Sequence, residues 1–502
     1  MSLRESYNKL NSLAEELILN GTIQSILTWD FETYMPSKGV ELRAKQLGYI
    51  AKIIHEKIID PIIGELIKVI KEHPDYNTLT DVEKRNVYLV KREYDKEIRV
   101  PTELAAEIAA QATKTIQIWK QAKKEKKYSL YKPELSKILE LVKKRAKYIN
   151  PDLEPFDVLL DEFEPGMTSD IITKLFDELK TGLIPIIEKC VASPNQPDLS
   201  IIKRTCPKSI QKELSKDIAR IVTYDLERGS IDETEHPFTT GYYDDVRITT
   251  HYYENDFANS FYSIMHEAGH ALYEQNLNRD FLYKPVGAYC SLGIHESQSR
   301  FIENILGRSP EFWEYYLTSF KTITGDIFSD VETHSLVHAI NQVIPSKIRV
   351  TADEVTYCLH IIIRFEIERD LLTGKISVDE LPSIWNRKYK EYLGVVIEDD
   401  SEGVMQDTHW AGGAFGYFPT YALGNIYNAQ MLNTMLKDIP NYYELIKSGN
   451  ISPIINWLIN NVHKPANMYN PPELMKKITG EEVNSKYFID YLEKKYSKLY
   501  GF

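Results

Sequence analysis

The chain has 502 residues, with 60 basic against 73 acidic side chains and a formal net charge of −13. This acidic excess argues against a nucleic-acid partner, because such binding depends on surplus Lys and Arg side chains that neutralise phosphates. With 43% hydrophobic and 26% charged residues, the composition is that of a globular protein with a large core, which excludes disorder as the main state.

The first segment of the chain predicts an amphipathic helix rather than a targeting signal. Leu10, Leu13 and Leu17 share one face, and charged residues interrupt any signal-peptide core. Nowhere does an apolar run reach the ~20 residues that a membrane span needs. The four cysteines are far apart and form no C-x-x-C pair, which favours reduced thiols over disulfides or a cysteine zinc site. We therefore expect a cytoplasmic protein with no membrane partner.

Helical periodicity runs through most of residues 1–230. Leu135, Ile138, Leu139 and Val142 follow the i, i+3, i+4, i+7 spacing of one helix face. The sequence contains no repeat of fixed period, which argues against a solenoid adaptor.

The segment 236–253 changes to strand periodicity. Val246 and Ile248 alternate with Arg247 and other polar residues, and a turn is expected near Asp244. One small β-sheet is therefore predicted at this point of the chain.

Helical patterns resume at about Asp256, run through Leu372, and return after an aromatic, glycine-rich stretch at residues 403–425. The expected fold is mainly α with one small sheet. Because no Pro/Gly/Ser-rich linker divides the chain, we expect one domain over residues 1–502, with a helical N-terminal region at 1–230, a catalytic core at 231–425 and C-terminal helices at 426–502.

The helix expected after Asp256 carries an H-E-x-x-H pattern, His266-Glu267-Ala268-Gly269-His270. On a helix, its two imidazoles project from adjacent turns of one face. An apolar stripe lies roughly opposite them and consists of Phe257, Phe261, Ile264, Ala268 and Leu272. The helix can therefore pack through one side and present two metal ligands on the other.

A catalytic zinc site needs a third protein ligand and an open position for water. A metzincin would have Gly at 273 and His at 276, but this chain has Tyr273 and Asn276, so that class is excluded. Glu296, at the start of a following helix, is the expected third ligand. Glu267 lies at the flank of the histidines, where it can accept a proton from metal-activated water. The alternative is a buried polar cluster that only stabilises helix packing.

Together with motifs elsewhere, these residues resemble the carboxypeptidase Taq family of zinc metallocarboxypeptidases. The chain departs from the family pattern at none of the motif positions. The motifs occur in family order and comprise Trp29-Asp30, Met35-Pro36, Arg43-Ala44, Phe163-Glu164-Pro165-Gly166-Met167, His236-Pro237-Phe238, Asp245-x-Arg247-x-Thr249, His295-Glu296-Ser297, Ile348-Arg349-x-x-Ala352-Asp353 and Gly403-x-x-Gln406-Asp407-x-His409-Trp410.

The resemblance implies a large helical, two-lobed, cleft-containing fold similar to neurolysin-like and angiotensin-converting-enzyme-like peptidases. It implies a homodimer that releases single residues, with broad specificity, from the C-termini of peptides. His266, His270 and Glu296 would hold Zn²⁺, and Glu267 would be the general base. Co²⁺ or Mn²⁺ also suit this ligand set.

The resemblance also assigns substrate-binding residues. Arg349 would meet the terminal carboxylate of the substrate, which a planar guanidinium binds through two parallel, charge-assisted hydrogen bonds. Arg247 is a second candidate for this role, and Arg364 is a weaker one. His236 and Asp407 also fall in family motifs and are expected near the substrate.

The tetrahedral intermediate needs donors aimed at its oxyanion. Tyr421 and His409 are the expected donors, with Tyr357 and Tyr417 as competitors.

Two other functions remain open at this point. A zinc-dependent oligopeptidase or dipeptidyl carboxypeptidase would use the same chemistry on other bonds. A non-enzymatic helical scaffold would hold a structural metal, but structural zinc sites are usually closed by four Cys or His ligands, unlike a His2Glu set with an extra base.

Overall fold

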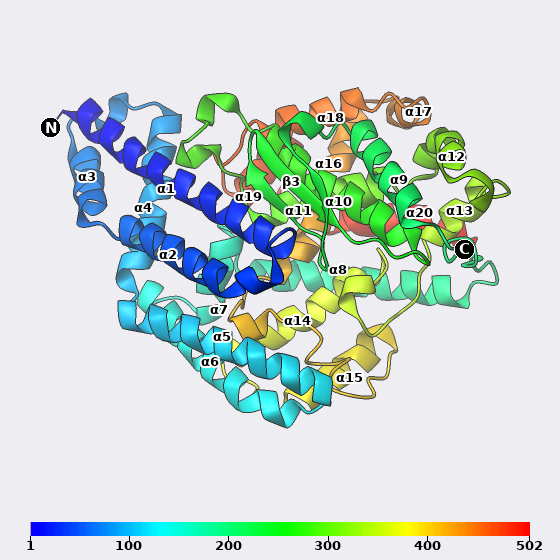
Figure 1. Cartoon of the computed structure of the whole chain (residues 1–502), viewed down its shortest axis with the longest axis horizontal. Helices are drawn as coiled ribbons and strands as arrows, with labels where there is room; N and C mark the ends of the chain where they lie inside the picture. Colours follow the sequence, from blue (N-terminus) through cyan, green and yellow to red (C-terminus); the bar gives the residue numbers. More distant parts are fainter. Residues whose placement is uncertain (1) are drawn as a thin grey trace.

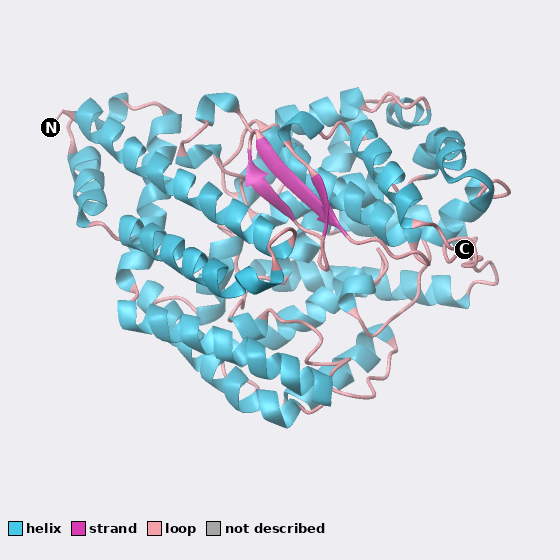
Figure 2. Cartoon of the chain, in the orientation of Figure 1, coloured by secondary structure: helices cyan, strands magenta, loops and turns pink. Residues whose placement is uncertain are grey.

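The computed structural model describes residues 2–502, and most of them are helical. Figure 1 shows helices from both ends of the chain gathered around a central region, and Figure 2 shows one small sheet set among them. The prediction of a mainly α fold with a single small sheet is confirmed for the described residues. No helix within this range combines the length and hydropathy that a membrane crossing requires.

The part of the chain before the sheet is helical, as its periodicity predicts. Leu135, Ile138, Leu139 and Val142 are all buried. The first helix begins with a capping box, in which Ser2 and Glu5 each satisfy a backbone N–H of the other. The helices are α1 (Leu3–Glu32), α2 (Val40–Ile58), α3 (Pro61–Glu72), α4 (Asp81–Arg99), α5 (Thr102–Glu125), α6 (Tyr128–Ile149), α7 (Pro155–Phe163), α8 (Ser169–Ala192) and α9 (Lys208–Ile221).

The sheet has three strands in the order β1-β3-β2. The hairpin of β2 (Thr239–Tyr242) and β3 (Asp245–Thr250) is antiparallel, and its turn includes Asp244, as predicted. The parallel strand β1 (Ile231–Glu233) was not predicted, since three residues are too few to show alternation.

The helices after the sheet include those that carry the site. They are α10 (Phe257–Gln275), α11 (Leu292–Arg300) with its π-helical continuation η6 (Phe301–Leu306), α12 (Pro310–Thr324), α13 (Thr333–Ile340), α14 (Tyr357–Leu372), α15 (Leu381–Leu393), α16 (Pro419–Asp438), α17 (Tyr442–Lys447), α18 (Ser452–Leu458), α19 (Pro471–Thr479) and α20 (Lys486–Tyr500). The expectation of a non-helical stretch through residue 425 is wrong, because Pro419 starts α16. Proline suits the first turn of a helix, where its missing N–H leaves no bond unmade.

Two glycines allow three core helices to approach closely. A Cβ at Gly269 of α10 would lie 2.6 Å from the carbonyl oxygen of Gln298 in α11. A Cβ at Gly424 of α16 would lie 2.7 Å from Cγ of Glu296 in α11. Both distances are far below van der Waals contact, so side chains at these positions would push the helices apart. The close packing brings functional groups of α10, α11 and α16 to one place.

Candidate active site

The three predicted metal ligands lie together. His266 and His270, on successive turns of α10, direct their Nε2 atoms toward Oε2 of Glu296 on α11, at 3.5 and 3.4 Å. One ligand atom from each residue falls within 4.8 Å of the other two. In a tetrahedral zinc site with bonds near 2.1 Å, neighbouring ligand atoms are roughly 3.4 Å apart. The trio therefore fits a divalent metal ion.

The local sequence explains why α10 presents its ligands in this way. The apolar stripe predicted opposite the histidines is buried, and Phe257 and Ile264 are fully inaccessible. Asp256 caps the start of the helix by accepting a hydrogen bond from the backbone N–H of Asn259. Burial of one face fixes the helix, and the imidazoles of the other face remain partly accessible.

The protonation states of His270 and Glu296 suit metal binding, whereas Glu296 and Glu303 raise the pKa of His266 despite its burial. Burial lowers the pKa of His270 to about 3, so its imidazole is neutral and has a free lone pair. Burial alone would raise the pKa of Glu296, but Arg300 and His266 together hold it well below its usual range. The site thus presents a neutral imidazole and a carboxylate at neutral pH.

Glu267 is buried beside the ligands and is held by a residue of the sheet. Its Oε2 accepts a hydrogen bond of 2.6 Å from Oγ1 of Thr239 on β2. Burial raises the pKa of Glu267, which makes its carboxylate a better proton acceptor. Sequence reasoning did not predict a role for Thr239, although this residue directly follows the His236-Pro237-Phe238 motif.

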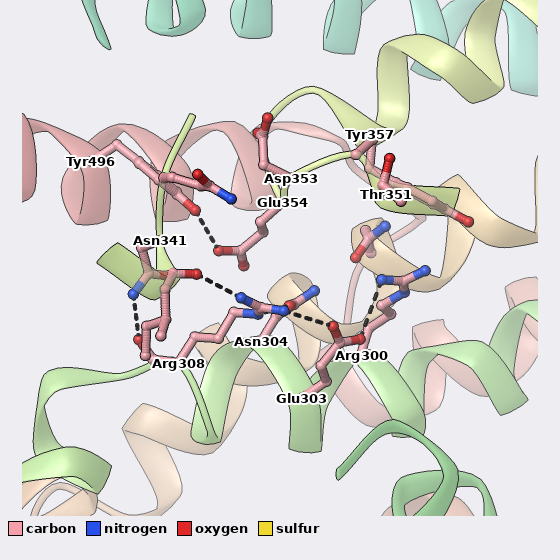
Figure 3. A pocket seen from close by; sticks show the side chains of 14 residues that line it. Arg300, Glu303, Asn304, Arg308, Asn341, Thr351, Asp353, Glu354, Tyr357 and Tyr496 are labelled. Atoms are coloured by element: carbon pink, nitrogen blue, oxygen red, sulfur yellow. Dashed lines mark hydrogen bonds and ion pairs between the residues drawn. The ribbon is translucent and has the colours of Figure 1, made fainter. Parts of the chain in front are cut away.

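Further charged side chains contact the predicted ligands, and sequence reasoning did not predict these either. Glu303 of η6 contacts Nδ1 of His266 at 2.9 Å, and Arg300 donates from Nε to Oε1 of Glu296 at 2.7 Å. Figure 3 shows Glu303 between the guanidinium groups of Arg300 and Arg308, each 3.2 Å away. The signal in the sequence was the spacing 296, 300, 303, which places these charges on one face of a continuous helix.

These charged groups line a cavity of about 120 Å³ next to the predicted metal ligands. Tyr357 lies on one side of it, with the guanidinium of Arg300 4.4 Å from the centre of its ring (Figure 3). A cavity of that volume has room for several water molecules.

Arg349 belongs to a buried charge network on the same side of the site as Tyr357. Its Nε and Nη2 donate to Oδ1 of Asp407 at 3.0 and 2.8 Å, and its Nη1 donates to Tyr357 at 3.2 Å. Arg364 donates from Nε to the other oxygen of Asp407 at 2.7 Å. Despite burial, the two arginines hold the pKa of Asp407 well below its usual range. A guanidinium has five N–H groups, so Arg349 keeps one free on each terminal nitrogen.

Tyr421 and His409 adjoin this network. The hydroxyl of Tyr421 lies 3.3 Å from Nε2 of His409, and its ring centre lies 5.1 Å from the guanidinium of Arg349. Tyr421 precedes Gly424 by one turn of α16, and Gly424 packs directly on Glu296. The structure therefore brings the predicted oxyanion donors close to the predicted metal ligands.

Arg247 and His236 lie outside this arrangement. Arg247 stacks on the ring of Trp29 in α1, 4.1 Å from its centre, and donates twice to Asp245 at 2.7 and 2.8 Å. His236 is exposed in the loop before β2. In the part of the chain that the structure describes, no hydrogen bond or ion pair joins either residue to the three predicted metal ligands.

Comparison with known proteins gives matches along nearly the whole chain. Residues 9–496 match the family described as Carboxypeptidase Taq (M32) metallopeptidase. Carboxypeptidase 1 of Bacillus subtilis is 42% identical over 477 residues, which cover 95% of each chain. Thermostable carboxypeptidase 1 of Thermus thermophilus is 37% identical over an alignment of 511 positions, which covers 100% of each chain.

Solved structures agree with these matches. The crystal structure of an M32 carboxypeptidase from Deinococcus radiodurans R1 superposes with a TM-score of 0.96 at 33% identity, covering 99% of this chain and 100% of that one. A carboxypeptidase of Pyrococcus furiosus superposes with a TM-score of 0.94 at 34% identity, covering 98% of this chain and 99% of that one. The chain described here belongs to the carboxypeptidase Taq (M32) metallopeptidase family.

Proposed function

We propose that this metallocarboxypeptidase removes single residues from the C-termini of peptides, with His266, His270 and Glu296 as its metal ligands and Glu267 as its general base. The observation that carries the assignment is that Oε2 of Glu296 lies 3.4–3.5 Å from Nε2 of both histidines, with the buried carboxylate of Glu267 at the flank of the trio. When bound there, a divalent ion supplies Lewis acidity and lowers the pKa of a water molecule to ~7. Zn²⁺ is the proposed ion, and Co²⁺ or Mn²⁺ also suit the donor set.

Glu267 moves the proton in this proposal. Because Thr239 donates to Oε2, that oxygen is fixed in position and Oε1 is the oxygen that can take up a proton from water. Protonated Glu267 then returns the proton to the amine that leaves when the peptide bond breaks. The raised pKa of Glu267 favours the first of these transfers.

Arg349 would bind the terminal carboxylate of the substrate through its two remaining N–H groups. Asp407, itself held by Arg364, fixes the plane of the guanidinium, so that little freedom is lost on binding. Tyr421 and His409 would donate to the oxyanion of the tetrahedral intermediate. The contacts of Arg247 support a different role, which is to anchor α1 on the sheet.

Replacement of Glu267 by Gln tests the central assignment. The variant should keep stoichiometric metal, because Glu267 is not a ligand, and kcat should fall by about 10²–10⁴-fold. Metal content is measured by atomic emission, and turnover is measured with an unblocked peptide. A metal-loaded variant with turnover close to wild type contradicts the proposed base.

The bond that is cut distinguishes a carboxypeptidase from the other peptidases. Mass spectrometry of a peptide pool should show ladders that shorten by one residue from the C-terminus, and C-terminal amides should resist. Loss of two residues at a time would indicate a dipeptidyl carboxypeptidase, and internal cleavage of amides would indicate an oligopeptidase.

We further propose a homodimer, on the basis of the resemblance of the sequence to the family, and a cytoplasmic location, on the basis of four separate cysteines that form no disulfide. Light scattering after size exclusion should give twice the chain mass of 58.2 kDa. A mass equal to that of one chain contradicts the dimer.

A further inference from the structure

A buried relay of side chains links one metal ligand back to its own helix. Glu274 lies one turn after His270 on α10, and His295 directly precedes Glu296 on α11. The Nδ1 atoms of His270 and His295 are 2.5 Å apart, and Nε2 of His295 is 3.0 Å from Oε1 of Glu274. His295 therefore bridges two side chains that are four residues apart on α10.

Only one placement of protons gives every contact of this relay a hydrogen-bond donor and an acceptor. Nε2 of His270 must be unprotonated to bind a metal, so its proton is on Nδ1. Nδ1 of His295 must then accept that proton's hydrogen bond, which places the proton of His295 on Nε2. This N–H points at Glu274, whose carboxylate is an acceptor. The opposite tautomer of His295 would bring two N–H groups together and leave Glu274 facing a lone pair.

The same contacts exclude His295 as a fourth ligand. Both of its ring nitrogens are already occupied, one by His270 and one by Glu274. Tyr289 packs edge-on against its ring, with the centroids 4.9 Å apart at 86°, and Tyr273 packs at 5.2 Å. Side chains that are walled in this way cannot easily turn toward the metal.

We propose that Glu274 and His295 are positioning residues that hold His270 in its metal-binding tautomer and orientation. This inference rests on the proposed ligand set. The other imidazole ligand is held differently, since His266 contacts the carboxylate of Glu303 directly. A carboxylate partner fixes the tautomer of a ligand imidazole and raises its basicity, and loss of such a partner typically weakens metal affinity by about 10–100-fold.

The test is the dissociation constant for Zn²⁺, measured on the full-length protein by competition with a chromophoric chelator. Glu274→Leu and His295→Phe should each raise the Kd by about 10–100-fold. The Kd of the double variant should be no higher than that of the weaker-binding single variant, because either change alone breaks the same relay. Glu274→Gln should fall between wild type and Glu274→Leu, since an amide oxygen still accepts from Nε2–H but carries no charge.

A matched control separates this effect from general destabilisation. Glu366 of α14 is 8% exposed, close to the 7% of Glu274, and it binds Lys180 and Lys388. Glu366→Leu should leave the Kd for Zn²⁺ within about twofold of wild type, whatever it does to the unfolding midpoint.

The outcomes also separate the relay from the ligand set. If His270→Ala binds Zn²⁺ as tightly as wild type, the ligand assignment fails and the relay fails with it. If His270→Ala abolishes tight binding but Glu274→Leu and His295→Phe bind normally, only the relay is wrong. The relay is also wrong if the Kd of the double variant rises by the product of the factors found for the two single variants. Should Glu274→Leu not fold, Glu274→Gln and His295→Phe give the same decision.

Discussion

At the scale of single residues, the chemistry depends on how buried charges are shared. Asp407 accepts from both Arg349 and Arg364, so two guanidiniums are held by one carboxylate and the cluster keeps a net positive charge. A buried cation is costly unless it is compensated, and a substrate carboxylate would supply the missing negative charge. This charge balance favours a free peptide C-terminus over an amide.

Replacement of Arg349 by Met tests that preference. Asp407 would still pair with Arg364, so the variant should fold with a balanced ion pair. Two charge-assisted hydrogen bonds of ~1.5–3 kcal/mol each would be lost, which predicts a fall of about 10²–10⁴-fold in kcat/KM for unblocked peptides. The small activity on the matching amide should change little. If free acids and amides lose activity equally, Arg349 does not read the carboxylate.

The proposed role of the Tyr421 hydroxyl as an oxyanion donor can also be tested. Tyr421→Phe keeps the ring beside Arg349 and removes the donor, so kcat should fall by about 10²–10³-fold, the range found for one oxyanion donor. Tyr417 is the matched control, since its ring centre lies 5.3 Å from that of Tyr421. Tyr417→Phe should turn over at close to the wild-type rate. The reverse pattern would assign the donor to Tyr417.

At the scale of elements, the site is an arrangement of three helices whose spacing is set by Gly269 and Gly424. The proposed ligands and their supporting charges recur at turn spacing on two of these helices, at 266, 270 and 274 on α10 and at 296, 300 and 303 on α11 with η6. Ligand geometry therefore depends on how close the helix axes approach.

Gly269→Ala tests this dependence. Its Cβ would fall 2.6 Å from backbone atoms of α11, which cannot move as a side-chain tip can. We expect a cost of about 1–3 kcal/mol in stability, together with weaker metal binding. Gly21→Ala in α1 is the control, because no atom lies within 4 Å of its new Cβ, and it should stabilise the protein by about 0.5–1 kcal/mol. Thermal unfolding and metal titration give both readouts, and equal effects of the two changes would contradict the close-packing account.

The same elements show how far the sequence alone could lead. Periodicity predicted the buried stripe of α10 and the β2–β3 hairpin, because both patterns are local. It could not predict that Asp407 joins Arg349 and Arg364, which lie 58 and 43 residues away along the chain. Nor did it mark Arg300 or Glu303, since charges at helical spacing are as common on solvated faces.

At the scale of the whole molecule, distant segments are tied to the site region by polar contacts. Tyr34, just after α1, donates to Asp232 of β1 at 2.6 Å, and Trp29 stacks on Arg247 of β3. Glu368 of α14 accepts from Trp410 at 2.7 Å and from the backbone of the following loop. Burial raises the pKa of Glu368, and this shift links the stability of the molecule to pH.

The raised pKa values of Glu164 and Glu368 determine whether stability rises or falls with pH. Both side chains are fully inaccessible, and burial raises their pKa values to about 7 and about 8, above the 4.5 of an ordinary Glu. At pH values between the ordinary pKa and these raised pKa values, the folded protein binds more protons than the unfolded chain. Stability is therefore greater at low pH and is lost as the pH rises through the pKa values of the folded protein. Between pH 7 and 8.5 the loss should be about 1–2 kcal/mol, most of it from Glu368.

Urea unfolding of the metal-free protein at pH 7 and pH 8.5 measures this loss as a fall in the midpoint. Glu368→Gln removes the titrating group but leaves an oxygen that can accept from Trp410. The variant should be less stable than wild type at pH 7, because an amide N–H₂ then faces the backbone N–H of Gly416. Its midpoint should nevertheless change less between the two pH values. The histidines contribute equally to both proteins, so the difference between the two shifts isolates Glu368, and identical shifts would show that this carboxyl does not titrate in the window.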